Sequence, residues 1–170
     1  MKMTGFAKSV LTIGLCSIAA IAVLERTRSA TAEPLADAEF KALIDGYYTA
    51  WSFAEGEGAA APARAGQFYA PEKDLVFFDL APMRYTGFEE YKAGATKMFD
   101  GIATNRIAPN DDLAVTRRGS VAWTTVTFRI DAKLKAGGGF ATAGRHTAIW
   151  EKRGDRWLIV HEHVSVPMPE

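Results

Sequence analysis

The last stretch of the chain constrains the fold more than any other. Residues 145–167, RHTAIWEKRGDRWLIVHEHVSVP, contain two runs rich in β-branched and aromatic residues, separated by a charged turn around Gly154. Glycine accepts the backbone conformation that a tight reversal needs, and the flanking charges keep the turn in water. The pattern therefore predicts two antiparallel strands joined as a β-hairpin.

The second strand of this hairpin sorts its residues with a period of two. One face would carry an apolar start and a polar end: Trp157, Ile159, His161, His163 and Ser165. The opposite face would carry an aliphatic row with one charged member: Leu158, Val160, Glu162, Val164 and Val166. Because both faces hold residues suited to contacts, we expect the strand to be covered on both sides.

The first 32 residues are typical of a secretory signal. Lys2 and Lys8 make a basic start, residues 10–24 form an apolar run, and an Ala-x-Ala pattern ends at Ala32. The run is short for a membrane span, which favours cleavage after Ala32 over a retained anchor. We therefore expect a periplasmic or secreted protein with no membrane attachment after cleavage, whose single domain covers residues 33–170.

Cleavage would change the chemistry available to the chain. It would remove Cys16, the one cysteine, so neither disulfides nor thiolate sites are expected. It would also take away four basic residues and one acidic residue, which leaves 16 basic and 19 acidic residues, or a net charge of −3. This balance argues against a nucleic-acid partner.

The rest of the chain alternates between helical and strand-like periodicity. Helices are predicted over residues 36–54, 62–69 and 88–99. Strands are predicted over residues 75–79, 84–87, 111–118, 121–132, 140–152 and 157–166. Helices gathered on one side of an antiparallel sheet define an α+β fold. We predict three N-terminal helices packed on a strongly curved antiparallel sheet, a cone whose concavity suits a small molecule.

Two segments resemble a known family. They are DLVFFDLAPMRYTGFEEYKAG, residues 74–94, and GRHTAIWEKRGDRWLIVHEHVSVP, residues 144–167. Both resemble the SnoaL-like branch of the nuclear transport factor 2-like superfamily, also called ketosteroid isomerase-like. The second is also similar to the closing hairpin of the calcium/calmodulin-dependent kinase association domain. The resemblance implies a conical pocket between the first helix and the concave sheet face, and a homodimer formed through the convex face.

Asp79 and two histidines are the candidate catalytic groups. Asp79 shares a strand face with Phe77, where an apolar residue would be expected. If the Trp157 face is concave, His161 and His163 line the same cavity. Burial and a neighbouring charge would move the pKa values of an aspartate and a histidine there towards neutral pH, as general acid–base catalysis needs. The resemblance implies that such groups work without a cofactor, and no cofactor is expected.

Six further residues are candidates for ligand contacts: Tyr47, Tyr48, Trp51, Tyr85, Arg145 and Trp157. The aromatic residues would form the wall of the cavity, or simply part of the core. By the resemblance, Tyr47 and Tyr48 are candidate counterparts of the tyrosine that holds the oxyanion in ketosteroid isomerases. Arg145 would bind a carboxylate of the ligand in a bidentate pair. Alternatively, it would close the cone through an ion pair with Asp79 or Glu162.

A metal site is a weaker interpretation of the two histidines. The spacing of His161 and His163 places two imidazoles on one strand face, which could suit zinc or copper. Further ligands would have to be Asp79 or His146, and His146 is predicted to lie on the face opposite Arg145. We therefore expect hydrogen-bonded histidines and no metal.

Three functions remain open from the sequence. The favoured one is an exported domain that binds a small anionic or carbonyl-bearing molecule in a conical pocket. The second is a cofactor-independent isomerase or lyase that uses Asp79 with one of the two histidines. The third is a dimerising scaffold with no active pocket. Inward polar groups are plentiful, but the sequence alone does not assign a complete set of acid, base and oxyanion donor.

Overall fold

The computed structural model describes residues 34–167, so the predicted signal segment, residues 1–32, lies outside the described part. The helices are α1 (Pro34–Trp51), α2 (Ala61–Ala65) and α3 (Phe88–Phe99), and short 3-10 turns cover Gly58–Ala60 and Gly66–Phe68. The strands are β1 (Val76–Phe78), β2 (Tyr85–Thr86), β3 (Ile102–Pro109), β4 (Ala114–Arg118), β5 (Val121–Leu134), β6 (Gly139–Arg153) and β7 (Arg156–Ser165).

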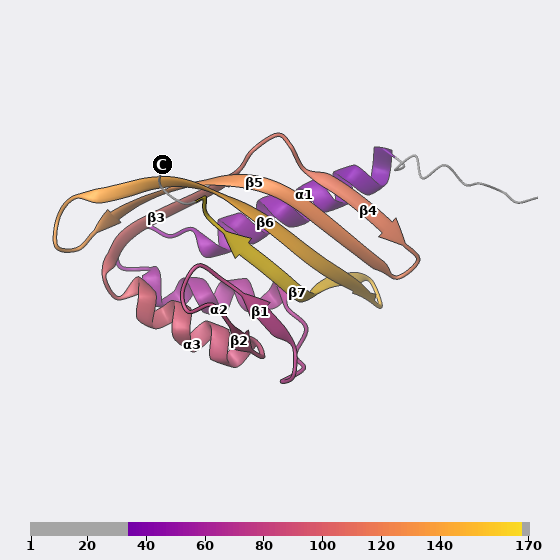
Figure 1. Cartoon of the computed structure of the whole chain (residues 1–170), viewed down its shortest axis with the longest axis horizontal. Coiled ribbons are helices and arrows are strands. Elements are labelled where there is room, and N and C mark those ends of the chain that lie inside the picture. Colours follow the sequence, from indigo (N-terminus) through magenta and orange to yellow (C-terminus); the bar gives the residue numbers. More distant parts are fainter. Residues whose placement is uncertain (1–33, 168–170) are drawn as a thin grey trace, which may run out of the picture. The chain divides into compact units, whose positions relative to one another are not determined.

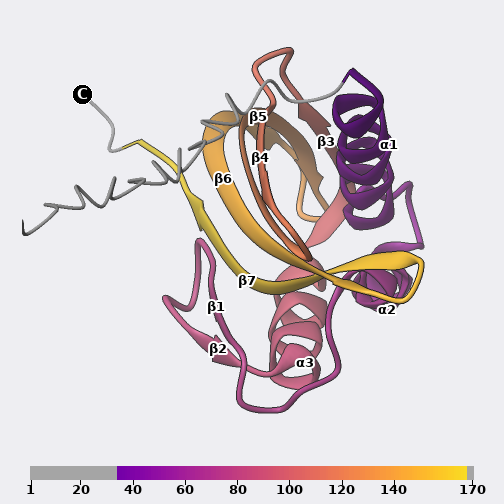
Figure 2. The same cartoon turned by 90° about the vertical axis from the view of Figure 1, so that its right-hand side faces the viewer.

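The strands form one curved sheet that holds all three helices on its concave side (Figure 1, Figure 2). Its order is β2-β1-β7-β6-β5-β3, and β4 also pairs with β5. The predicted α+β class is therefore confirmed. The prediction of a purely antiparallel sheet is wrong, because β1 runs parallel to β7, with Phe77 opposite Glu162.

The strand β3 was not predicted from the sequence, and the length of β5 accounts for its presence in the sheet. Residues 102–109 form β3, which pairs with the second half of β5, whereas β4 pairs with the first half. A strand of 14 residues is long enough to hold two partners in succession along one edge. Five strands rather than four therefore follow α3.

The helix α1 packs against the sheet through its apolar stripe, as predicted. Phe40, Ile44, Tyr47 and Tyr48 recur at three- and four-residue spacing, and all four are buried. The helix ends at Trp51, and the next residues turn so that Phe53 exchanges backbone hydrogen bonds with Asn105 on β3. This stripe and the sheet together enclose an aromatic core.

A β-bulge in β7 decides which side chains of the last strand face that core. Trp150 on β6 pairs with Ile159, but the preceding residue, Ile149, pairs with His161. Val160 is therefore an extra residue in β7, and such an insertion changes the alternation of side chains from that point on. Trp157 and Ile159 face the core as predicted, and after the bulge the inward position passes to Glu162.

Candidate functional site

Glu162 is a carboxylate in the middle of the core. Its side chain is 0% exposed. The hydroxyl of Tyr69 donates a hydrogen bond of 2.8 Å to Oε1, and the hydroxyl of Tyr47 donates one of 3.1 Å to Oε2. A buried carboxyl is costly unless it is hydrogen-bonded, so α1 and the segment after α2 each supply a donor that lets β7 hold this group.

His146 on β6 lies beside this carboxyl. Val164 is its partner in the β6–β7 register, so Glu162 is its diagonal neighbour on the same face. Its Nε2 is 3.4 Å from Oε2 of Glu162, but the direction does not suit a hydrogen bond and the nitrogen has no partner. Its Nδ1 is 3.2 Å from the Tyr48 hydroxyl, and the Tyr47 ring stacks on the imidazole. The imidazole is therefore held in one orientation.

Tyr91 and Asp79 lie near this centre. Burial raises the pKa of Tyr91, on α3, and the nearby carboxyl groups of Glu162 and Asp79 act in the same direction. Asp79 follows β1 two residues after Phe77 and is half-buried, and its Oδ1 accepts the backbone N–H of Leu80 at 2.7 Å. We call this set of neighbouring polar groups, which includes the partly exposed Asp79 carboxyl, the Glu162 network. Its members are Tyr47, Tyr48, Tyr69, Asp79, Tyr91, His146 and Glu162.

Burial sets the protonation of this network. Burial raises the pKa of Asp79 to about 6, the nearby Glu162 carboxyl acts in the same direction, and the hydrogen bond from Leu80 opposes the shift. Burial, with the Glu162 charge, also raises the pKa of Tyr47, Tyr69 and Tyr91 well above the usual value. The three hydroxyls therefore keep their protons at neutral pH and act as hydrogen-bond donors.

The raised pKa of Asp79 predicts that this residue destabilises the fold at neutral pH. The ionised form is disfavoured in the folded state, so the destabilisation is absent below the unfolded pKa of 3.8, grows as the pH rises from there to about 6, and is fully present above that value. Asp79→Asn is expected to raise the free energy of unfolding at pH 7.5 by about 1–3 kcal/mol. Chemical denaturation should show this gain shrinking towards zero at pH 4. An equal gain at both pH values would contradict the shift.

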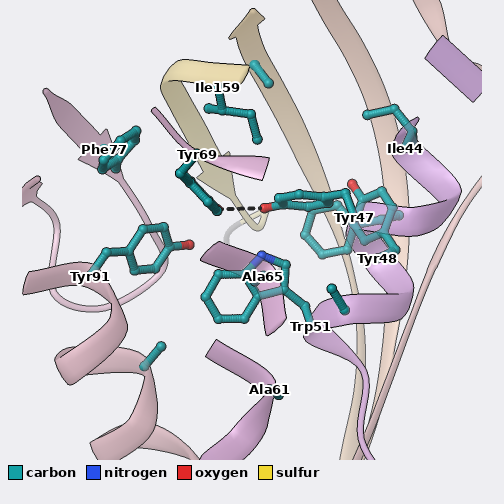
Figure 3. Close-up of a cluster of buried hydrophobic side chains, with 14 of the residues drawn as sticks. Ile44, Tyr47, Tyr48, Trp51, Ala61, Ala65, Tyr69, Phe77, Tyr91 and Ile159 are labelled. Carbon is teal, nitrogen blue, oxygen red and sulfur yellow. Dashed lines mark hydrogen bonds between the residues drawn. The ribbon is translucent and has the colours of Figure 1, made fainter. Parts of the chain in front are cut away.

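Two buried nitrogen atoms of this region, one of them in the network, have no hydrogen-bond partner in the described part of the chain. Figure 3 shows the Tyr91 and Tyr47 hydroxyls and the Trp51 indole nitrogen directed towards the middle of the aromatic cluster. Trp51 Nε1 and His146 Nε2 are buried and have no hydrogen-bond partner. Each unpaired buried group costs about 1–3 kcal/mol, so a chain selected for stability alone would not be expected to keep both. An ordered water or a bound molecule would pair them.

The structure brings several of the predicted site residues to this region. Tyr47 and Tyr48 belong to the Glu162 network, and Trp51 is packed against Tyr91. Tyr85 also stacks on Tyr91, and its own hydroxyl donates to the Ala81 carbonyl. These residues share the concave side of the sheet.

Trp157 is buried but lies elsewhere. Its ring packs against Phe40, near the beginning of α1, and its indole N–H donates to Glu39 at 3.1 Å. Arg117 lies over the same ring, with its guanidinium 5.0 Å from the ring centroid. These contacts hold the start of α1 on the sheet, and none of them joins Trp157 to the Glu162 network.

The predicted inward placement of His161, His163 and Arg145 is wrong. His163 and Arg145 are exposed, and His161 is half-buried with its Nδ1 2.7 Å from the Val76 carbonyl oxygen. For the histidines the cause is the bulge at Val160, which exchanges the two faces of β7 beyond it. Arg145 pairs with Ser165 in the register and shares that outer face. Among the described residues, it forms no ion pair with either proposed carboxylate.

The same shift moves other predicted residues inward. His146 and Glu162 were both expected on the outer side and are instead buried, and Val164 packs against the core. Sequence reasoning also missed Tyr69 and Tyr91 as site residues. The available signal was their phenol hydroxyls, because a buried tyrosine usually finds a polar partner in the core.

Two further properties concern metals and membranes. Residues 34–167 contain no group of three or more histidine, cysteine, aspartate or glutamate side chains placed to hold a metal ion. Within the same residues, no helix combines the length and the apolar character that crossing a membrane requires.

Comparisons with known proteins agree with this architecture. Residues 41–169 match the model of the SnoaL-like domain. No curated protein matches the chain by sequence. Among solved structures, a nuclear transport factor 2-like superfamily protein from Salmonella enterica serovar Typhimurium is similar at a TM-score of 0.66 and 20% identity, over 78% of this chain and 91% of that one.

Two other solved structures carry more specific names. A candidate scytalone dehydratase from Novosphingobium aromaticivorans is similar at a TM-score of 0.66 and 9% identity, over 79% of this chain and 86% of that one. A candidate calcium/calmodulin-dependent protein kinase II association domain from Xanthomonas campestris is similar at a TM-score of 0.63 and 22% identity, over 78% of this chain and 87% of that one. At these identities the similarity concerns the fold.

Proposed function

Because this chain belongs to the SnoaL-like domain family, we propose that it binds a small carbonyl-bearing molecule at the Glu162 network and moves a proton on it without a cofactor. One observation carries the proposal. The half-buried carboxyl of Asp79 lies near a buried set of hydroxyl, imidazole and carboxyl groups, and burial raises its pKa to about 6. Such a pairing of a basic group with fixed hydrogen-bond donors is what proton abstraction beside a carbonyl requires.

Asp79 would be the general base. It is ionised above pH 6 and remains partly exposed, so we propose that a substrate approaches the network from its side. Asp79 would take the proton from the carbon next to the carbonyl group. The electron pair released would pass to the carbonyl oxygen and form an enolate, which needs hydrogen-bond donors. The Tyr91 hydroxyl is one candidate, because Asp79 is among the nearby groups that raise its pKa and it keeps its proton at neutral pH.

The fate of the enolate separates isomerisation from water loss. Return of the proton from Asp79 to another carbon would complete an isomerisation. Departure of a β-hydroxyl group as water would complete a dehydration, with His146 or a tyrosine as the candidate proton donor. The structural neighbour named as a candidate scytalone dehydratase supports water loss at the level of fold.

Export and self-association are part of the same proposal. The signal-like residues 1–32 support export, with cleavage after Ala32. Exposed apolar side chains on the outer sheet face, Trp123 and Val121 on β5 and Phe78 on β1, support a homodimer through that face. Light scattering of the purified protein should give the mass of a dimer, and Trp123→Glu should give a monomer. A wild-type monomer at 100 µM, a concentration of the order used for such measurements, would contradict this part.

Proton NMR in D2O tests the catalytic proposal without knowledge of the natural substrate. A panel of small cyclic ketones, enones and β-hydroxyketones is incubated with the protein, and loss of the signals next to the carbonyl group, or release of an enone, is followed. The proposal expects at least one compound to react tenfold or more above buffer, an order of magnitude at the low end for a general base. Compounds that raise the melting temperature but never exchange protons would favour a binding domain instead.

A further inference from the structure

A cavity outside the Glu162 network lies between the end of α2 and the beginning of α3. Its volume is about 670 Å³, which falls within the range of about 300–1,000 Å³ of small-molecule sites. Residues from α2, from the connection to β1, and from α3 line it, among them Ala63, Gly66, Tyr69, Lys73, Phe88 and Lys92. None of the predicted site residues contributes to its wall.

The wall of this cavity combines aromatic side chains with positive charge. The rings of Tyr69 and Phe88 stack on each other with centroids 4.4 Å apart. Lys92 is ion-paired with Glu89, which also lines the cavity. Lys73 forms no ion pair within residues 34–167, so one ammonium group at the cavity lacks a counter-charge. Aromatic rings and an unopposed cation together favour a planar molecule with a negative charge.

We infer that this cavity binds a planar aromatic carboxylate, with its ring against Tyr69 and Phe88 and its carboxylate at Lys73. This site is additional to the one proposed for catalysis and does not depend on it. The two sites share one residue, because the hydroxyl of Tyr69 donates to Glu162 while the residue also lines the cavity. A molecule bound there therefore contacts a member of the Glu162 network.

Titration with 2-naphthoate, followed by amide shifts in NMR spectra of the purified protein, tests the site. Saturable shifts are expected at Tyr69, Lys73 and Phe88. Ala63 lines the cavity from an exposed position on α2, so Ala63→Trp places an indole in the space that the ligand needs. This variant should weaken 2-naphthoate binding at least tenfold, on the order of the loss of the contacts that one aromatic ring makes. The matched control, Ala59→Trp, changes an exposed alanine that does not line the cavity and should bind as the wild type does.

The charge is tested separately with 2-acetylnaphthalene, a neutral molecule of similar shape. Lys73→Gln should weaken 2-naphthoate binding about two- to fivefold, the size expected for one exposed ion pair, and should leave 2-acetylnaphthalene binding unchanged. Shifts confined to other surfaces, or equal affinities in Ala63→Trp and the wild type, would overturn the inference. Binding of 2-naphthoate here with no proton exchange on any ketone would leave this site standing and remove the proposed function.

Discussion

Asp79→Asn is expected to slow proton exchange on any carbonyl compound that the protein turns over by about 10²–10⁴-fold. Asparagine keeps the shape of the side chain and an oxygen that can accept the Leu80 N–H, but it cannot take a proton at neutral pH. Substrate binding should change little, because the Tyr91 hydroxyl and the rest of the network stay in place. The effect should therefore appear in kcat more than in KM. NMR exchange rates measured over a range of substrate concentrations provide both values.

Asp74→Asn is the matched control for this variant. Asp74 is exposed and lies in the turn before β1, so the same change of charge there should leave the rate within about twofold of the wild type, as for surface substitutions in general. Full turnover by Asp79→Asn would remove Asp79 as the base. The variant also links the two roles of the residue, because the same substitution is predicted to stabilise the fold at pH 7.5. A residue that costs stability and supplies activity is typical of a functional site.

Glu162→Ala is expected to lower the free energy of unfolding by about 3–5 kcal/mol, the cost of removing one partner from a buried charged network. The Tyr47 and Tyr69 hydroxyls would lose the acceptor to which they donate, and His146 would lose its neighbouring carboxyl. Each of these groups that stays unpaired in the aromatic environment costs about 1–3 kcal/mol. Urea denaturation at pH 7 measures the loss.

Two variants limit the interpretation of that loss. Glu162→Gln keeps one side-chain oxygen as an acceptor and should therefore destabilise the fold less than Glu162→Ala. Glu55→Ala changes an exposed glutamate in the turn after α1 and should stay within about 0.5 kcal/mol of the wild type. A loss of less than 1 kcal/mol in Glu162→Ala, about the size of a surface effect, would mean that the Glu162 carboxyl contributes little to the stability of the core.

Much of the fold could be predicted because its signals are local. The apolar stripe of residues 36–54 predicted α1, and the pattern of residues 88–99 gave the bounds of α3 as the structure has them. The glycine turn at Gly154 predicted the β6–β7 hairpin. The parallel pairing of β1 with β7 could not be predicted in this way, because it joins segments that are far apart in the chain and its register leaves no local pattern.

The candidate site was predicted only in part for a similar reason. Asp79 and the two neighbouring tyrosines on α1 were singled out because a polar group in an apolar row is visible in the sequence. The structure places the tyrosines in the buried core and Asp79 at a half-buried position, and their role stays a prediction. For the last strand, β7, the prediction of which side chains face the core was wrong beyond Val160. A bulge adds one residue without any mark in composition, and every side chain after Val160 then changes face. Glu162 was the hint, since a carboxylate inside an aliphatic row needs a special environment.

The most direct test of the account is the pH dependence of kcat/KM for proton exchange by the wild type. Ionisation of Asp79 as the base predicts a rate that rises with pH and levels off, with a midpoint near 6, and Glu162→Gln should move the midpoint down because the Glu162 charge helps to raise the pKa of Asp79. A midpoint near 3.8, the value of an ordinary aspartate, or a rate independent of pH would contradict the claim that this residue works from within the Glu162 network.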